Sequence, residues 1–165
     1  MVTIRSAGIA AIPVIRSIAQ RSWAEAYKDI LQPDQMSYML EKFYSLAALD
    51  HQFNVLKYKT VLALDNNQPV GFATYSPKEN ARDVFKLHKI YLLPEQHGRG
   101  TGRYLLEHII EDIKNHQANI LELNVNRFNK ARSFYEKLGF RIVEEVDIPI
   151  GNGYFMNDYV MQKSI

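Results

Sequence analysis

A strand that runs into three alternating glycines and then into a helix is the feature that most constrains how this chain can fold. The apolar run from Val84 to Leu93 stops at Pro94, and glycines follow at positions 98, 100 and 102. Apolar residues then recur at helical spacing on one side of the next segment, namely Leu105, Leu106, Ile109, Ile110 and Ile113. Glycine allows positive φ angles, and the free N–H groups at a helix start attract anions. The pattern therefore predicts a strand, an anion-binding turn and an amphipathic helix.

Two nucleotide-binding motifs with a similar turn are excluded. A dinucleotide fingerprint beginning at Gly100 would need glycine or alanine where the chain has Leu105. A P-loop would need lysine after its last glycine, but Arg103 follows Gly102. Arg99 and Arg103 are expected near the helix N-terminus, where the helix dipole disfavours cations. Two arginines there favour a phosphate group as the normal occupant of the turn.

Length and composition limit the function classes further. The chain has 165 residues, of which 47% are hydrophobic and 23% charged, which predicts one ordinary globular domain spanning residues 1–165. Its net charge of +2 gives no reason to expect a nucleic acid or a membrane surface as partner. The absence of cysteine excludes disulfides, thiolate metal sites and cysteine nucleophiles, and we expect no metal. Neither a membrane span nor a signal peptide is recognised, so we expect a cytoplasmic protein.

The apolar patterns predict the element order β-α-α-β-β-β-α-β-α-β-β. Strands are expected at residues 2–6, 57–64, 70–75, 84–93, 120–125, 140–146 and 154–161. Helices are expected at residues 9–27, at 33–44, from the glycine turn to about 113, and at 130–138 before a capping glycine. Hairpins combined with a strand–helix–strand unit predict an α+β domain with a mixed, mostly antiparallel central sheet flanked by helices.

A second segment, residues 129–140, reads Asn-Lys-Ala-Arg-Ser-Phe-Tyr-Glu-Lys-Leu-Gly-Phe. Together with the glycine turn, it resembles the GNAT superfamily of N-acetyltransferases over residues 84–140. That family combines a Q/R-x-x-G-x-G/A loop with a later stretch like N-x-x-A-x-x-x-Y-E-K-x-G-F. The resemblance implies the GNAT-like acyltransferase fold, with acetyl-CoA as the cosubstrate.

The resemblance also implies roles for residues of both segments. The backbone of Ile90, Tyr91 and Leu92 would pair with the pantetheine arm of acetyl-CoA, and the Leu92 N–H would polarise the thioester carbonyl. Tyr135 would protonate the leaving thiolate, since a phenol with a pKa near 10 can do so within hydrogen-bond reach. The remaining cofactor-binding residues are the loop and one asparagine, namely His97, Gly98, Arg99, Gly100, Thr101, Gly102, Arg103 and Asn129.

The group that takes a proton from the acceptor amine is less clearly marked. Many bacterial relatives carry a glutamate in a Leu-Glu-Val strand, where this chain has Asn124. We favour His88, which matches a position where aralkylamine acetyltransferases carry a histidine. Strand alternation predicts that His88 shares a face with Ile90 and Leu92, and imidazole titrates near neutrality. Glu122 and a water molecule ordered by Asn124 stay open as alternatives.

The N-terminal helices are expected to cover one wall of the acceptor site. Their spacing favours packing in the core, although an aromatic wall also suits an amine. The aromatic and apolar side chains concerned are Trp23, Tyr27, Met36, Tyr38, Met39, Phe43 and Tyr44. This pattern is similar to a bacterial branch that includes polyamine acetyltransferases, so we expect a small-molecule primary amine, with a polyamine favoured. Acidic groups for a polyamine would come from Glu41, Asp50, Asp147 or Asp158, among which the sequence does not choose.

Two other functions stay open. One is acetylation of a protein N-terminus or of a lysine side chain, which needs an open groove in place of a pocket. The other is a catalytically silent acyl-CoA-binding module, which the missing glutamate keeps open although Tyr135 favours an enzyme. A homodimer also stays open.

Overall fold

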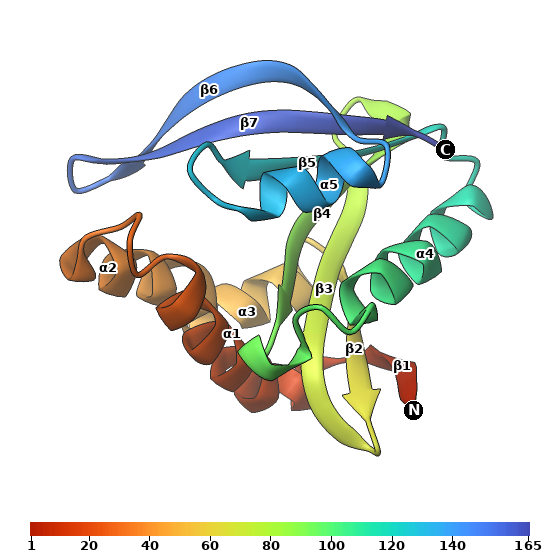
Figure 1. Ribbon diagram of the computed structural model, residues 1–165, viewed down its shortest axis with the longest axis horizontal. Helices are drawn as coiled ribbons and strands as arrows, with labels where there is room; N and C mark the ends of the chain where they lie inside the picture. Colours follow the sequence, from red (N-terminus) through yellow and green to blue (C-terminus); the bar gives the residue numbers. More distant parts are fainter.

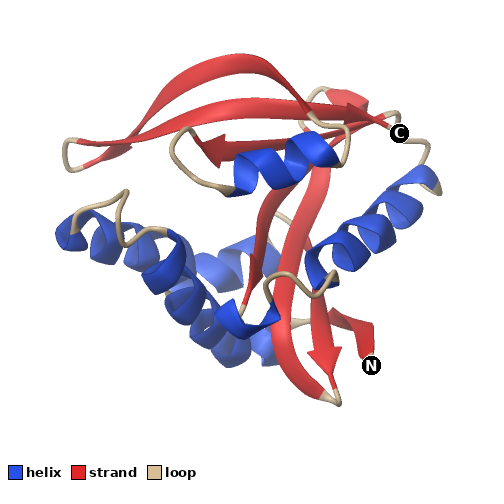
Figure 2. Ribbon diagram, viewed as in Figure 1, coloured by secondary structure: helices blue, strands red, loops and turns tan.

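The computed structural model describes residues 1–165 as one seven-stranded sheet with helices on both faces (Figures 1 and 2). The strands are β1 (Val2–Ala7), β2 (Lys59–Asp65), β3 (Gln68–Lys78), β4 (Ala81–Leu92), β5 (Ile120–Asn126), β6 (Arg141–Gly151) and β7 (Tyr154–Ser164). The α-helices are α1 (Ile12–Ala26), α2 (Pro33–Tyr44), α3 (Leu46–Asn54), α4 (Thr101–Lys114) and α5 (Ala131–Lys137). Short 3-10 turns, η1 (Ile9–Ala11) and η2 (Pro94–Gln96), precede α1 and the glycine turn.

The strand order across the sheet is β1-β2-β3-β4-β5-β7-β6. Every neighbouring pair is antiparallel except β4 and β5, which are parallel and are joined by the crossover helix α4. A parallel pair needs a crossover of this kind because a tight turn cannot reverse the chain direction twice. The predicted α+β class with a mixed, mostly antiparallel sheet is therefore confirmed.

The parallel pair β4–β5 is short, and this opens the middle of the sheet. Val84 to Leu87 pair with Ile120 to Leu123, and no pairing between the two strands continues beyond them. In Figure 1 β5, β6 and β7 cross the top of the molecule, whereas β2 to β4 extend below them. From His88 to Leu92, β4 is therefore paired with β3 on one edge and with no strand on the other.

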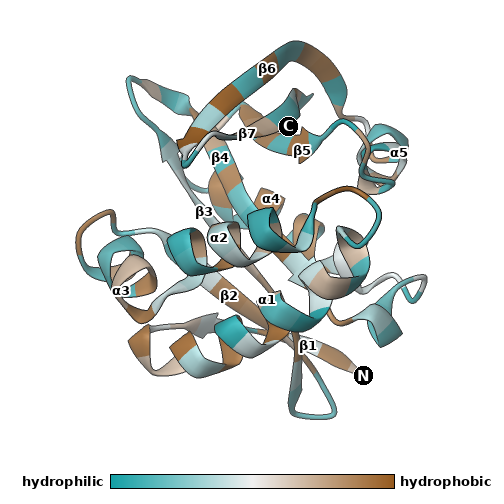
Figure 3. Ribbon diagram, turned by 90° about the vertical axis from the view of Figure 1, so that its left-hand side faces the viewer, coloured by the Kyte–Doolittle hydropathy of each residue, from teal (hydrophilic) through white to brown (hydrophobic).

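Two apolar cores lie on opposite faces of the sheet. On the α1–α3 face, helices α1, α2 and α3 pack against β2, β3 and β4 through side chains that include Ile15, Trp23, Tyr44, Leu49 and Phe72. On the α4–α5 face, the core includes Phe85, Leu105, Ile109, Leu123 and Tyr135. Hydrophilic residues lie along the viewer-facing side of α1 and α2 in Figure 3, as expected for amphipathic surface helices. None of the helices is both long and apolar enough to cross a membrane.

The structure differs from the sequence-based expectation mainly at α3. This helix was not predicted, because its nine residues carry a weak amphipathic pattern directly after α2. Ser45 separates the two helices with an extended backbone and caps α3, since its Oγ accepts a hydrogen bond from the Ala48 N–H at 3.1 Å. Strands β6 and β7 are also longer than predicted, because their outer residues alternate too little to be recognised as strand.

Candidate active site

The glycine turn presents a row of unpaired backbone N–H groups. Gly98 and Gly100 have φ angles of 77° and 80°, a region that residues with a side chain rarely adopt. Helix α4 starts at Thr101, and no side chain caps its first turn. None of the backbone N–H groups from Gly98 to Arg103 donates a hydrogen bond within the protein. Consecutive free N–H groups at the positive end of a helix dipole form an anion-binding concavity.

A buried glutamine holds this turn in place. The Thr101 hydroxyl donates to Gln96 Oε1 at 2.9 Å, and Gln96 Nε2 donates to Asp65 Oδ2 at 3.1 Å. Gln96 is buried, whereas the neighbouring His97 is exposed. Arg99 also reaches Asp65, at 3.7 Å, with its guanidinium mostly in solvent. Gln96 was not predicted as a site residue, because its supporting role depends on Asp65, a partner in a distant strand.

The two sequence segments meet in space at the start of α4. A Cβ added at Gly102 would lie 3.3 Å from Phe134 Cζ and 3.4 Å from Leu92 Cδ1. The end of β4, the glycine turn and α5 therefore converge at one point. Asn129 lies in the loop before α5, where its Oδ1 accepts a hydrogen bond from the Ala131 N–H at 2.9 Å. This hydrogen bond pairs the backbone N–H of the first residue of α5.

Tyr135 lies at the edge of this convergence. Its ring is buried and packs edge-on against Phe134 and Phe140, with ring centroids 5.3 and 5.7 Å away. Burial raises the pKa of Tyr135 well above its ordinary value, and the nearby Tyr27 phenol adds to the rise. No hydrogen bond from a protein group opposes that rise. Tyr135 therefore stays protonated at neutral pH with its proton free for another acceptor.

The opposite face of β4 is covered by aromatic rings from the N-terminal helices. Trp23 packs against Tyr27, Tyr44 and Tyr91, with ring centroids 4.8, 5.7 and 5.8 Å away. The hydroxyl groups of Tyr27 and Tyr91 lie 3.3 Å apart. Most of these rings are buried in the α1–α3 core, which confirms that core packing is the first role of the predicted aromatic stripe.

A β-bulge corrects the predicted orientation of His88. Tyr75 pairs with Leu87 and Thr74 pairs with Lys89, so His88 is the extra residue of β4. The bulge reverses the strand alternation. Leu87 packs in the α4–α5 core before it, and Ile90 and Leu92 pack against that core after it. The expectation that His88 shares a face with Ile90 and Leu92 is therefore wrong.

His88 contacts groups on the α1–α3 face instead. Its Nε2 lies 2.7 Å from Ser76 Oγ, and its ring stacks on Tyr58 with centroids 4.1 Å apart. Burial lowers the pKa of His88 to about 4, and the charges of Lys86 and Lys89 act in the same direction. The imidazole is therefore neutral at pH 7, and one of its nitrogens is already engaged by Ser76.

This environment predicts a specific loss of stability in mild acid. Because the pKa of His88 is about 4 in the folded chain and near 6.5 when unfolded, protonation favours unfolding as the pH falls through that window. We expect a loss of roughly 1–3 kcal/mol from this residue over the window. Chemical denaturation of the wild type and of His88→Gln at several pH values measures it. Equal pH dependence in the two proteins would contradict the assignment.

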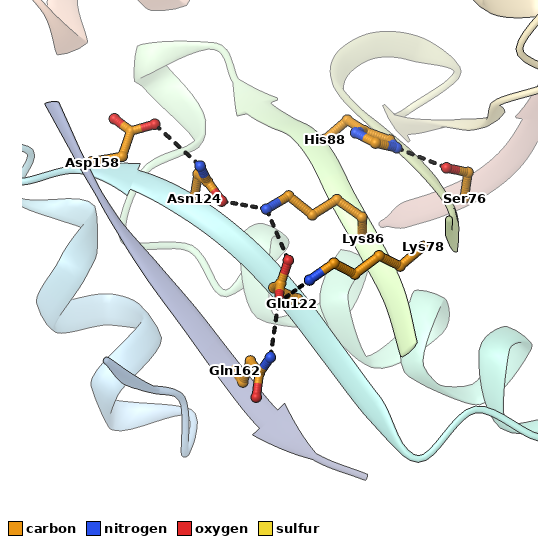
Figure 4. Close-up of polar contacts among 8 residues, drawn as sticks. All are labelled: Ser76, Lys78, Lys86, His88, Glu122, Asn124, Asp158 and Gln162. Atoms are coloured by element: carbon orange, nitrogen blue, oxygen red, sulfur yellow. Dashed lines mark hydrogen bonds and ion pairs between the residues drawn. The ribbon is translucent and has the colours of Figure 1, made fainter. Parts of the chain in front are cut away.

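Polar side chains of β3, β4, β5 and β7 form a connected network on the α1–α3 face (Figure 4). Glu122 is buried and accepts hydrogen bonds from Lys78 at 3.0 Å, Lys86 at 3.2 Å and Gln162 at 2.8 Å. Burial raises the pKa of Glu122, but these donors outweigh it and the net shift is downward. Lys86 also donates to Asn124 Oδ1. Glu122 is therefore an anion saturated by three donors.

Asp158 stands at the other end of this network. It is buried on β7, and its one hydrogen bond is a long contact of 3.5 Å from Asn124 Nδ2. Burial raises the pKa of Asp158, although Asn124, Lys86 and Arg127 oppose the rise. From the sequence, Asp158 was only one of four acids that could meet a polyamine. Of those four, Asp158 alone is fully buried.

Comparison with known proteins identifies relatives across most of the chain. Residues 25–154 match a family model described as an acetyltransferase (GNAT) domain. A [ribosomal protein bS18]-alanine N-acetyltransferase of Haemophilus influenzae is 37% identical over 92 residues, which are 56% of this chain and 59% of that protein. The chain thus spans about three fifths of that relative. An uncharacterised N-acetyltransferase of Mycobacterium tuberculosis is 27% identical over 152 residues, covering 92% of this chain and 96% of that protein.

The fold is shared with solved structures. The PaiA N-acetyltransferase of Thermoplasma acidophilum, crystallised in complex with coenzyme A, superposes with a TM-score of 0.83. The alignment covers 100% of this chain and 99% of that one at 23% sequence identity. The arrangement of the sheet and its helices is therefore the same in the two chains.

Proposed function

The chain belongs to the GNAT family of acetyltransferases, and from this premise we propose that it transfers the acetyl group of acetyl-CoA to a primary amine of a small molecule. The observation that carries the proposal is the row of unpaired N–H groups from Gly98 to Arg103, next to an unpaired edge of β4 and to Tyr135. Acetyl-CoA supplies the activated acyl group as a thioester. The residues of this chain bind it, orient it and handle the protons.

The glycine turn suits the pyrophosphate of acetyl-CoA. Its free N–H groups can donate to phosphate oxygens without breaking any hydrogen bond of the protein. The positive φ angles of Gly98 and Gly100 aim successive N–H groups into one concavity. Arg99 and Arg103 are mostly solvent-exposed and add positive charge beside it. This fit supports binding of acetyl-CoA at the turn.

The unpaired edge of β4 suits the pantetheine arm. The Leu93 N–H donates to the Val70 carbonyl on the β3 side at 2.8 Å. Successive N–H groups of a strand point to opposite edges, so the Leu92 N–H points to the edge without a strand partner. This direction supports the role proposed for Leu92, which is to donate a hydrogen bond to the thioester carbonyl as charge builds on its oxygen.

Tyr135 is the proposed proton donor to the thiolate of CoA. It is protonated at neutral pH, and no protein group competes for its proton. We leave His88 out of the proton-accepting role, because Ser76 engages its Nε2 and its pKa of about 4 makes it a weak base. Glu122 is left out as well, because three donors already saturate its carboxylate.

A polyamine is the acceptor that we favour within the small amines. The aromatic wall of Trp23, Tyr27 and Tyr91 and the buried carboxylate of Asp158 suit a cationic amine on an apolar stem. A second candidate is acetylation of a protein N-terminus, which is favoured by the likeness to the alanine N-acetyltransferase of Haemophilus influenzae.

An acceptor panel tests this proposal. CoA release from acetyl-CoA is followed with spermidine, an arylalkylamine, free amino acids, a peptide beginning with alanine and a lysine peptide. We expect the highest kcat/KM with spermidine or another small amine. A higher value with the alanine peptide would shift the function to protein N-terminal acetylation. CoA binding without turnover of any acceptor would support a silent acyl-CoA-binding module.

A further inference from the structure

We propose that Asp158 accepts the proton of the acceptor amine, in place of the glutamate that many GNAT relatives carry where this chain has Asn124. This inference rests on the proposed acetyl transfer to an amine and names the residue that makes the amine nucleophilic. From the sequence, Glu122 was an alternative candidate for the base, and Asp158 was only one of four acids that could meet a polyamine. The geometry of β5 and β7 distinguishes them.

The position of Asp158 meets the geometric requirement. Leu87 and Leu123 form the last β4–β5 pair, and beyond them Asn126 of β5 pairs with Asp158 of β7. Asp158 therefore lies in the part of the sheet where β4 and β5 have separated. Its contact with Asn124 Nδ2 at 3.5 Å shows that its carboxylate lies within one hydrogen bond of the usual glutamate position.

Asp158 and Asn124 share the α1–α3 face of the sheet. Leu123 and Val125 on β5, and Met161 on β7, pack in the α4–α5 core, so the alternate residues point to the opposite face. Figure 4 shows Asp158 and Asn124 side by side, with Lys86 on the far side of Asn124. The carboxylate therefore points toward the helices that form the proposed acceptor wall, away from the α4–α5 core.

The charges around Asp158 leave its carboxylate available. Lys86 comes from β4 but is held by Glu122 and Asn124. Arg127 comes from the loop after β5 and donates to Asp147 at 2.7 Å. Just after α1, burial raises the pKa of the Tyr27 phenol, and the charge of the nearby Asp158 adds to the rise. Each cation near Asp158 thus has its own anionic partner, and no strong donor saturates the carboxylate as three donors saturate Glu122.

Burial makes this carboxylate a better base than an exposed one. Loss of hydration raises the pKa of Asp158, with Lys86 and Arg127 opposing the rise. An ammonium group that enters the same low-dielectric region loses hydration too, which lowers its own pKa. Both shifts reduce the difference in proton affinity between the amine and the carboxylate. Proton transfer within an initial ion pair therefore becomes easier than in water.

The proposed transfer moves one proton to Asp158 and one from Tyr135. The acceptor enters as R–NH3⁺ and gives one proton to the Asp158 carboxylate. The amine nitrogen then bonds to the thioester carbonyl carbon, the carbon–sulfur bond breaks, and the sulfur takes the Tyr135 proton. The tyrosinate recovers a proton from the nitrogen, and Asp158 releases its proton to solvent. The net change is R–NH3⁺ plus acetyl-CoA to the acetamide, CoA and one H⁺.

The test compares Asp158→Asn with Asp83→Asn, which makes the same chemical change at an exposed carboxylate of β4. The best acceptor of the panel is used, and kcat/KM, the CoA dissociation constant and thermal unfolding are measured. We expect Asp158→Asn to lower kcat/KM near pH 7 about 100-fold, with CoA affinity unchanged. The loss should shrink toward about pH 9.5, where more of the amine is already neutral. Asp83→Asn should stay within about twofold of the wild type, as expected for an exposed charge.

The outcomes separate the two proposals. If the wild type turns over an acceptor and Asp158→Asn keeps a near-normal kcat/KM, the role of Asp158 is overturned and the proposed function still holds. Absence of wild-type turnover with every acceptor would overturn the proposed function, and this inference with it. If Asp158→Asn fails to fold, Asp158→Ser, which is smaller and neutral, is held to the same outcomes. If His88→Gln instead shows the loss of kcat/KM, and its recovery at high pH, that is expected of Asp158→Asn, the proton acceptor is His88 and this inference is overturned.

Discussion

Replacing Tyr135 by phenylalanine is expected to lower kcat about 100-fold or more, the usual effect of losing a general acid. The ring and its packing against Phe134 and Phe140 remain, so folding and the KM for acetyl-CoA should change much less. The loss arises because the thiolate of CoA would leave without a proton donor. Steady-state kinetics, with single-turnover measurements to confirm that chemistry limits the rate, provide the test.

A neighbouring tyrosine serves as the matched control. Tyr159 of β7 pairs with Val125 and packs under Arg132, with the guanidinium carbon 5.0 Å from the ring centroid. Tyr159→Phe removes the same atom and should leave kcat within about twofold, since substitutions of this kind usually have small effects. If Tyr135→Phe has a kcat as high as that of this control, Tyr135 only packs in the core and is not the proton donor.

Replacing Gly100 by tryptophan is expected to weaken CoA binding strongly in a protein that still folds. The space around Gly100 is open, so the new side chain is expected to extend into the concavity formed by the free N–H groups. Loss of the phosphate hydrogen bonds should cost about 2–4 kcal/mol, or on the order of 30- to 700-fold in Kd. Calorimetric titration with CoA measures this change directly.

The strain of a side chain at positive φ needs its own control, because it costs about 1–2 kcal/mol of folding free energy. Gly153 lies in the turn between β6 and β7 with a φ of 77°, and nothing surrounds its Cβ position within 4 Å. Gly153→Trp therefore reproduces the strain of Gly100→Trp away from the glycine turn. If the two folded variants bind CoA with similar affinity, the glycine turn does not bind the phosphates of CoA.

Local features of the fold could be predicted from the sequence because they depend on neighbouring residues. The strand before Pro94, the glycine turn and the amphipathic helix α4 follow from φ preferences and side-chain spacing within one segment. Helix α3 was missed although Ser45 carries a cap signal, because the segment is short and its apolar spacing is weak. The sequence-based site residues Leu92, Gly102 and Tyr135 belong to segments that the structure brings together.

The bulge at His88 shows why side-chain direction was harder to predict. Alternation along a strand assumes an unbroken register, but β4 gains one residue against β3 between Leu87 and Lys89. That insertion depends on pairing with a different strand, so no pattern within residues 81–92 reveals it. His88 consequently lies against Ser76 and Tyr58, and its predicted place beside Ile90 was wrong.

By itself, the sequence determined the glycine turn and most strands and helices, because short-range backbone preferences encode them. The family resemblance came from two motifs, and the fold class came from the order of the elements. Only the tertiary structure decided which of the two buried carboxylates is left with few hydrogen-bond donors. Glu122 and Asp158 are both buried acids on strands, but three donors saturate the first and one long hydrogen bond reaches the second. That difference arises from the pairing of β5 with β7 and from the separation of β4 and β5, which bring together residues far apart in the chain. The strength of a buried base depends on those long-range neighbours, since they control both its hydration and its hydrogen bonds.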